Sequence, residues 1–335
     1  MHAGKSYKVS EFLFWTRRSI YALIIVGIVP VVLYEYAGLK WINIPWPMVA
    51  LLGTATAFIV GFKNTQTYHR SADAQQVWTT IMSLSRNWAL LSRDYFNDAD
   101  ITKALVYRHL AWLTALRYEM RSHRVWETTE KKHNTEFQRH YRIPEKLSPL
   151  KAELAKYLDE QELQQVLGST NQATQVMGLQ SKALKQYCDQ QQFGPLQFME
   201  MERGLKEFLV QQGQSEQVKN APYPRQYAII NTFFVKLFCL LLPFGMLKEF
   251  EKLNDITDGI MKGHMVWLVV PFSILISWMY TSLEQVGEST ENPFEGSAND
   301  VPISHICRTI EIELKELLGE EVPATRQSGE HIIIL

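Results

Sequence analysis

Three side chains at helical spacing are the first candidates for a functional site: Thr54, Phe58 and Phe62, at positions i, i+4 and i+8. At about 100° per residue they form one stripe along a helix. An aromatic ring has a positive edge, so rings turned edge-on to a narrow passage can accept a partly dehydrated anion, while their apolar carbons form a constriction that dewets. The same spacing also fits a stripe that faces lipid or a neighbouring helix.

A second stripe, made of Gly53, Ala57 and Gly61, lies beside the first. Small residues at this spacing allow a neighbouring backbone to come close in lipid. The helix that carries both stripes begins in an apolar run at Val49 and passes into a polar, cationic segment that leads to Arg70. We interpret this change as the point where the chain leaves a membrane.

Lys236 is a further candidate, because it lies in the middle of an apolar segment. A lysine that faces lipid at such a depth costs at least about 2.5 kcal/mol. It therefore either faces a pore, where it attracts anions, or is paired or buried inside the helical bundle. We favour the second interpretation.

Patterns for catalysis or metal binding are missing from the sequence. It has no glycine-rich phosphate loop, no nucleophile elbow, and no His-x-x-x-His or Cys-x-x-Cys pair. The histidines are scattered, and His123, His133 and His140 fall in or beside a basic polar segment, which is typical of a solvated surface rather than of a metal site. We expect no enzyme activity, no metal and no cofactor.

The distribution of apolar residues predicts a membrane protein with a large aqueous part. The 335 residues are 46% hydrophobic, but the apolar residues are concentrated in four blocks and the middle of the chain is polar. The formal net charge of -1 gives no reason to expect nucleic acid as a partner. Cys188, Cys239 and Cys307 show neither metal nor disulfide spacing, so we interpret them as small buried hydrophobes.

The four apolar blocks define the expected topology. They predict membrane-spanning helices at residues 20–36, 48–62, 227–247 and 265–283. An even number of spans places both termini on one side. Basic residues mark that side as the cytoplasm by the positive-inside rule, namely Lys5, Lys8, Arg17, Arg18, Lys63 and Arg70.

The remaining residues are expected to form a helical cytosolic part. Residues 63–222 contain no stretch apolar enough to cross a bilayer. Their periodicity predicts helices at 72–96, 101–126, 147–167, 171–190 and 195–212, a loop at 127–144, and an amphipathic helix at 302–318. We divide the chain into a basic segment with two spans (1–70), a cytosolic helical domain (71–222), two further spans (223–292) and a cytosolic C-terminal segment (293–335).

Several motifs resemble the bestrophin family, especially its bacterial members. They are Gly61-Phe62-Lys63-Asn64 followed by Tyr68, Arg70, Trp78 and Ser85-Arg86; Ala221-Pro222-Tyr223-Pro224; the run from Leu237 to Phe244; Glu291-Asn292-Pro293-Phe294; and the run from Ile306 to Glu311. They occur in the family's order and cover nearly the whole chain. The resemblance implies an all-α membrane protein with four transmembrane helices per subunit and a helical cytosolic domain, assembled as a pentameric channel.

The resemblance also implies roles for individual residues. Bestrophins place three apolar side chains at the spacing of Thr54, Phe58 and Phe62 in the pore neck, although Thr54 departs from the bulky aliphatic residue that is usual there. Family members have a second, cytosolic constriction, which we expect at Leu196 or Met199 unless both are core residues.

Calcium is not expected to bind. Animal bestrophins bind calcium beside a run of acids after Asn-Pro-Phe, but the run from Glu295 to Asp300 contains two acids here, and Glu295 stands where glycine is usual.

We therefore expect a homo-oligomeric channel of the cell inner membrane that passes chloride or other small inorganic anions. A cation-selective channel on the same fold and a non-conducting membrane scaffold or sensor are the alternatives. The expected partners are the lipid bilayer, small ions and further copies of the chain. The apolar end from Ile332 to Leu335 fits a plug, a docking strand or a frayed tail.

Overall fold

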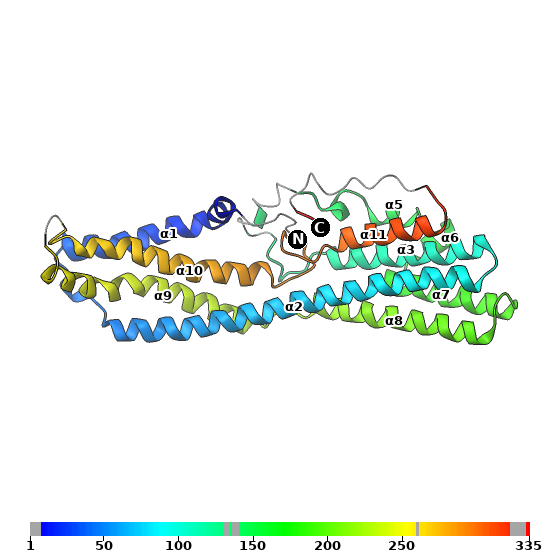
Figure 1. Ribbon diagram of the computed structural model, residues 1–335, viewed down its shortest axis with the longest axis horizontal. Helices are drawn as coiled ribbons and strands as arrows, with labels where there is room; N and C mark the ends of the chain where they lie inside the picture. The colour runs from blue at the N-terminus through cyan, green and yellow to red at the C-terminus, as the bar shows by residue number, and fades with distance from the viewer. Residues whose placement is uncertain (1–7, 130, 132–133, 136–140, 259–260, 322–332) are drawn as a thin grey trace. The chain divides into compact units, whose positions relative to one another are not determined.

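The protein is all-helical in a computed structural model that describes residues 8–129, 131, 134–135, 141–258, 261–321 and 333–335. The α-helices are α1 (Val9–Glu35), α2 (Trp46–Tyr95), α3 (Ala99–Arg121), α5 (Leu150–Leu154), α6 (Glu160–Leu167), α7 (Gln172–Asp189), α8 (Pro195–Asn220), α9 (Arg225–Glu251), α10 (Val269–Ser289) and α11 (Ile303–Leu317) (Figure 1). Short 3-10 helices occur at Lys40–Ile42, Pro144–Lys146, Lys252–Asp255 and Met265–Leu268. The all-α prediction is confirmed.

The helices form two compact units. The apolar unit contains the described residues up to His69 together with Tyr223–Glu291, and the polar unit contains Arg70–Pro222 and Asn292–Leu335. Helix α2 belongs to both, because the boundary between His69 and Arg70 falls inside it.

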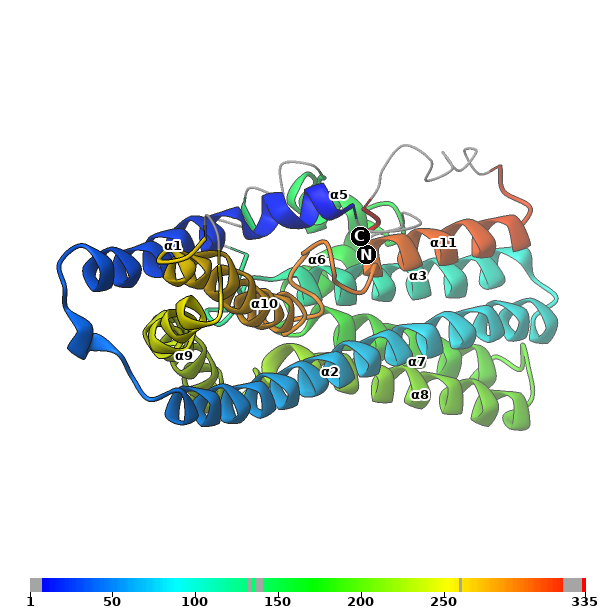
Figure 2. The same ribbon diagram turned by 60° about the vertical axis from the view of Figure 1, so that its left-hand side comes forward.

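The apolar unit consists of α1, the first part of α2, α9 and α10, which lie side by side (Figure 2). Its buried core includes Val31, Val49, Phe238, Leu242 and Val269. Each of the four helices is long and apolar enough to cross a membrane. The prediction of four spans is confirmed.

The polar unit is built around large aromatic side chains. Trp78 and Trp88 from α2, Trp112 from α3 and Phe208 from α8 are fully buried. One polar group inside this core is satisfied locally, since the Trp112 indole N–H donates to Gln212 Oε1 at 2.9 Å. The core thus ties α2, α3 and α8 into one packed body.

Several helix boundaries differ from the prediction. The expected second span and the expected helix at 72–96 are one continuous helix, α2, because no proline or strong turn signal separates them. The expected helix at 147–167 is two helices, α5 and α6, and the Asp159 carboxylate caps the start of α6 by accepting from the Glu162 N–H at 2.8 Å. Helix α8 begins at Pro195, as predicted.

The last described residues pack against the polar unit. Ile333 and Leu335 are buried beside Ile143, and the Leu335 carbonyl oxygen accepts from the backbone N–H of His305 at 2.7 Å, in the first turn of α11. Residues 333–335 therefore form a docked segment rather than a frayed tail. Ile332 lies outside the described residues.

Candidate functional site

The predicted stripe on α2 is exposed in the subunit. Phe58 and Phe62 are 65% and 69% exposed, and Thr54 is exposed as well. The three side chains line an open groove of about 760 Å³, whose other wall includes Phe238 and Tyr280. The Thr54 hydroxyl donates to the carbonyl of Ala50 at 3.0 Å, so its one hydrogen-bond donor is used by its own helix.

The stripe of small residues is only partly covered. A Cβ atom at Gly53 would lie 2.7 Å from the Phe238 ring, so this position requires glycine for the packing of α9 against α2. Ala57 is exposed, and nothing lies within 4 Å of a Cβ atom built on Gly61. Within the subunit, the close approach predicted for this stripe occurs at Gly53 alone, with a side chain and not with a backbone.

The first charged residue after the stripe turns away from it. Lys63 is 4% exposed, and its Nζ lies 3.9 Å from Oε2 of Glu291, which is equally buried. The neighbouring Asn64 amide oxygen would lie 2.1 Å from a Cβ atom at Gly287, so any side chain there would displace the amide. The charge of Lys63 is therefore used inside the apolar unit and is absent from the groove.

Sequence reasoning missed this pair, although periodicity contains the signal. Lys63 is in phase with Thr56, Val60 and Thr67, at spacings of four, three and four, and all of these are buried. A lysine on the packed face of a membrane-spanning helix requires a partner. Glu291, at the end of the last span, supplies it.

Within one subunit Lys236 is not buried inside the bundle, and its placement at a pore stays a prediction. Lys236 is exposed on α9, in a stripe with Ile229, Phe233 and Leu240 at spacings of four, three and four. It forms no ion pair among the described residues. The packed side of α9 carries Val235 and its neighbours, so the lysine points outward, where its long stem lets the ammonium reach water.

Leu196 and Met199 are 81% and 67% exposed in the first turn and a half of α8. They are therefore not core residues of the polar unit. Their role as a second constriction stays a prediction.

The loop after α10 holds a buried cluster of opposite charges. The Glu295 carboxylate accepts from the backbone N–H and the hydroxyl of Thr128, both at 2.9 Å. Asp300 accepts from the Gly296 N–H at 2.6 Å, and its Oδ2 lies 3.4 Å from Nη1 of Arg121. Burial raises the pKa of Glu295 to about 8 and also raises the pKa of Asp300. The Arg121 guanidinium thus offsets the charge of Asp300, and a protonated Glu295 carboxyl is a poor calcium ligand.

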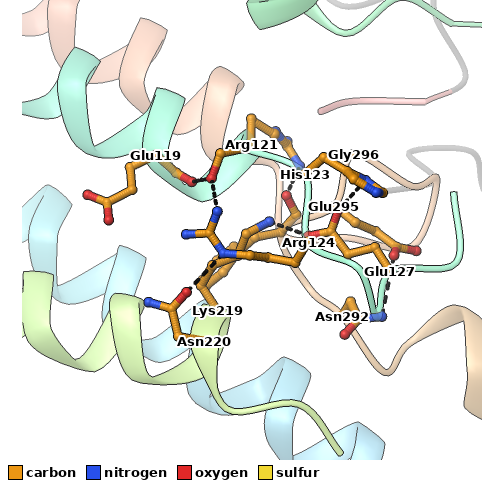
Figure 3. A network of polar contacts seen from close by, with 12 residues as sticks. Glu119, Arg121, His123, Arg124, Glu127, Lys219, Asn220, Asn292, Glu295 and Gly296 are labelled. Carbon is orange, nitrogen blue, oxygen red and sulfur yellow. Dashed lines mark hydrogen bonds and ion pairs between the residues drawn. The ribbon is translucent and has the colours of Figure 1, made fainter.

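A second buried pair connects the end of α8 to the segment after α3. Lys219 forms an ion pair with Glu127, and both side chains are buried. Figure 3 shows that Arg124 and His123 flank this pair. Arg124 donates to Asn220 Oδ1 at 3.0 Å, and Nδ1 of His123 lies 3.4 Å from Glu127.

His133 and His140 lie outside the described residues. Among those described, no group of three or more His, Cys, Asp or Glu side chains converges as a metal site would require.

Comparison with known proteins decides the family. The sequence profile of the family described as "Bacterial/Fungal Bestrophin protein" matches residues 15–316. The chain belongs to this family. Bestrophin relatives include the voltage-dependent anion channel-forming protein YneE of Escherichia coli K12, which is 26% identical over 87% of this chain and 82% of its own length. The voltage-dependent anion channel-forming protein mll4386 of Mesorhizobium japonicum is 25% identical over 82% of this chain and 75% of its own.

The fold of this chain also matches that of a solved bacterial structure. The crystal structure of a bacterial bestrophin homologue from Klebsiella pneumoniae superposes with a TM-score of 0.76 at 21% identity, and the match covers 91% of this chain and 99% of that one. A bestrophin with four apolar helices is a membrane protein.

Proposed function

We propose that this bestrophin is a passive channel for chloride and other small anions, and that copies of α2 surround its pore. The channel-forming names of its relatives support an anion pathway. The single observation that carries the location is the exposure of Phe58 and Phe62 on a membrane-spanning helix, beside an open groove. Thr54, Phe58 and Phe62 then form the pore neck.

The assembly follows from the geometry of one stripe. A single face of a single helix cannot enclose a hole, whereas head-to-tail contacts between copies close into a ring. We propose a homopentamer, as the family resemblance implies. The rim of each ring of phenylalanines then presents positive ring edges to the ion, and the narrow apolar neck limits the rate by dewetting.

The proposed orientation places the polar unit in the cytoplasm and the apolar unit in the inner membrane. The basic residues that flank the inner ends of the spans favour this side. In this arrangement Leu196 and Met199 are the candidates for a second, cytosolic constriction. No reaction is assigned to the chain, because transport by such a pathway needs positioning and solvation alone.

The test measures currents of the purified full-length protein in planar bilayers under a tenfold KCl gradient. An anion-selective pore gives a reversal potential that approaches about 59 mV in magnitude with the sign for chloride. The opposite sign would identify a cation-selective channel on the same fold. Absence of current, together with capture of a defined partner, would identify a scaffold. Native mass spectrometry in the same detergent reports the number of subunits.

Variants locate the neck. Phe58→Ala and Phe62→Ala widen the constriction and raise the single-channel conductance. Phe272→Ala is the matched control, because Phe272 is also an exposed phenylalanine of the apolar unit but lies on α10. If the conductance responds to all three variants alike, or to none, then the neck is not formed by α2.

A further inference from the structure

A recessed cavity of about 190 Å³ lies inside the polar unit, to which all of its lining residues belong. Its walls come from α3, from residues 144–157 around α5, and from α11, and α3 contacts both of these helices (Figure 1). An apolar cavity of about 150 Å³ accepts benzene, so this one has room for about six to eight non-hydrogen atoms. Its exposed lining is largely polar, which favours a polar occupant.

The cavity is lined by a buried guanidinium that makes no hydrogen bond within the described residues. The Arg117 side chain on α3 is 14% exposed. Its Nε lies 3.2 Å from Oε1 of Glu145 without forming a hydrogen bond, and the other guanidinium nitrogens donate to no described residue either. Burial of a charged donor group without acceptors is costly. The guanidinium therefore has donors that a ligand can use.

The nearest carboxylate is already engaged by other groups. Oε1 of Glu145 accepts from the Ser304 hydroxyl at 2.6 Å, and Oε2 of Glu145 lies 3.7 Å from Nε of Arg121. One buried carboxylate thus faces two buried arginines. Positive charge from Arg117 is left over at the cavity wall.

The acids that line the cavity also have partners. Glu153 accepts from Nζ of Lys156 at 2.6 Å, and Glu311 accepts from Nη1 of Arg308 at 2.6 Å. The lining contains these two acids and three bases, the third base being Arg117, so its formal charge is +1. The hydrogen-bonding capacity that remains unused is that of a cationic donor, which selects an anionic acceptor.

We propose that this cavity binds a small monocarboxylate, held by the guanidinium of Arg117. A carboxylate matches the planar fork of an arginine with two parallel hydrogen bonds. A single negative charge balances the formal charge of the lining, whereas a doubly charged phosphate is repelled more strongly by Glu153 and Glu311. The bound ligand contacts α3 and the elements packed against it, and so stabilises the polar unit. This site does not depend on the proposed pore.

Isothermal titration calorimetry of the full-length protein in detergent, with sodium L-lactate as the probe, tests the site. Lactate is small enough for the cavity and carries one carboxylate, and lactamide has the same size without the charge. At a constant concentration of sodium chloride we expect saturable binding of lactate with a Kd of about 1 mM or lower. We expect lactamide not to bind.

Variants identify the group that holds the carboxylate. Arg117→Lys keeps the charge beside Glu145 but loses the fork, and it weakens lactate binding by about tenfold or more. Arg108→Lys is the matched control, because Arg108 lies on the same helix, is 15% exposed, and donates to Glu162 at 2.7 Å outside the cavity. This control keeps the affinity of the parent. Ser148→Leu places a larger side chain at the cavity wall, leaves every arginine in place and also weakens binding.

The outcomes that contradict the proposal are distinct from a failure of the channel. A parent that does not bind lactate, or that binds lactamide equally well, shows that the cavity holds water alone. Tighter binding of inorganic phosphate than of lactate overturns the assignment of a monocarboxylate. Parent-like affinity in Arg117→Lys, or in Ser148→Leu if the first variant does not fold, overturns the site. Because calorimetry measures no current, none of these results bears on the proposed pore.

Discussion

The stability of the polar unit should depend on pH through one buried histidine. His109 on α3 is 2% exposed, and its ring lies among Trp88, Trp112 and Phe208, with centroids 4.6 to 6.3 Å away. Its Nε2 lies 2.9 Å from Oγ of Ser85. The Ser85 hydroxyl donates to the carbonyl of Ile81, so its oxygen accepts and the imidazole donates. This geometry favours the neutral ring, because none of these partners provides an acceptor for a second ring proton.

The magnitude follows from proton linkage. Burial lowers the pKa of His109 from 6.5 to about 3. Between these values the unfolded chain binds a proton that the folded chain excludes, so the free energy of unfolding falls as the pH falls from 6.5 toward 3. At pH 5 the difference amounts to about 2 kcal/mol, and near pH 7.5 it is close to zero. For a unit of this size, that is about 4 to 8 °C in melting temperature.

Thermal melts of the parent and of His109→Gln at pH 7.5 and pH 5 test this reasoning. The glutamine retains a donor toward Ser85 but does not titrate. Its deficit relative to the parent should shrink by about 2 kcal/mol on acidification. Taking the difference between the two proteins cancels the titration of other groups. If His109→Gln loses stability in parallel with the parent, the imidazole is not held neutral by burial.

Two further predictions concern packing and charge. Glu295→Gln should gain stability relative to the parent when the pH is raised from 6 to 9, as measured in thermal melts. The pKa of Glu295 is raised from 4.5 to about 8, so the parent's free energy of unfolding falls as the pH rises through 8, whereas glutamine does not titrate. Gly53→Ala should lower the free energy of unfolding by about 1 to 3 kcal/mol, as measured in thermal melts, because its Cβ would lie 2.7 Å from the Phe238 ring. Gly61→Ala is the control and should change the stability little, because nothing lies within 4 Å of a Cβ atom there. Equal effects of the two alanines would contradict this assignment.

The number and approximate limits of the apolar helices could be predicted, because a run of apolar residues has few alternatives to a membrane span. The continuity of α2 could not. The change from apolar to polar residues after Phe62 marks a change of surroundings, and a helix crosses such a change without interruption when no breaker is present. The break between α5 and α6 was missed for the opposite reason: its signal is a single N-capping residue, Asp159, inside an otherwise periodic stretch.

Individual faces were predictable only where the helix is chemically asymmetric. The stripe of Thr54, Phe58 and Phe62 could be placed by its phase, and these residues are exposed together. Helix α9 is apolar on nearly every side around Lys236, so its sequence contains no pattern that distinguishes the packed side from the outer side. The periodicity of α2 could indicate that Lys63 is buried, but it could not identify Glu291 as the partner, because the two residues are more than two hundred positions apart in the sequence.

The distribution of charge suggests that rate and selectivity are separate properties of the proposed pore. The neck residues have no formal charge, and the nearest cation along the chain, Lys63, is neutralised on the packed side of α2. An apolar neck determines how costly it is to remove water from any ion, irrespective of its sign. The sign of the preferred ion must then be determined by charged groups outside the neck. Phe58→Ala should accordingly raise the conductance at a nearly constant permeability ratio, as measured from reversal potentials in a KCl gradient, and a permeability ratio that changes as much as the conductance would contradict this separation.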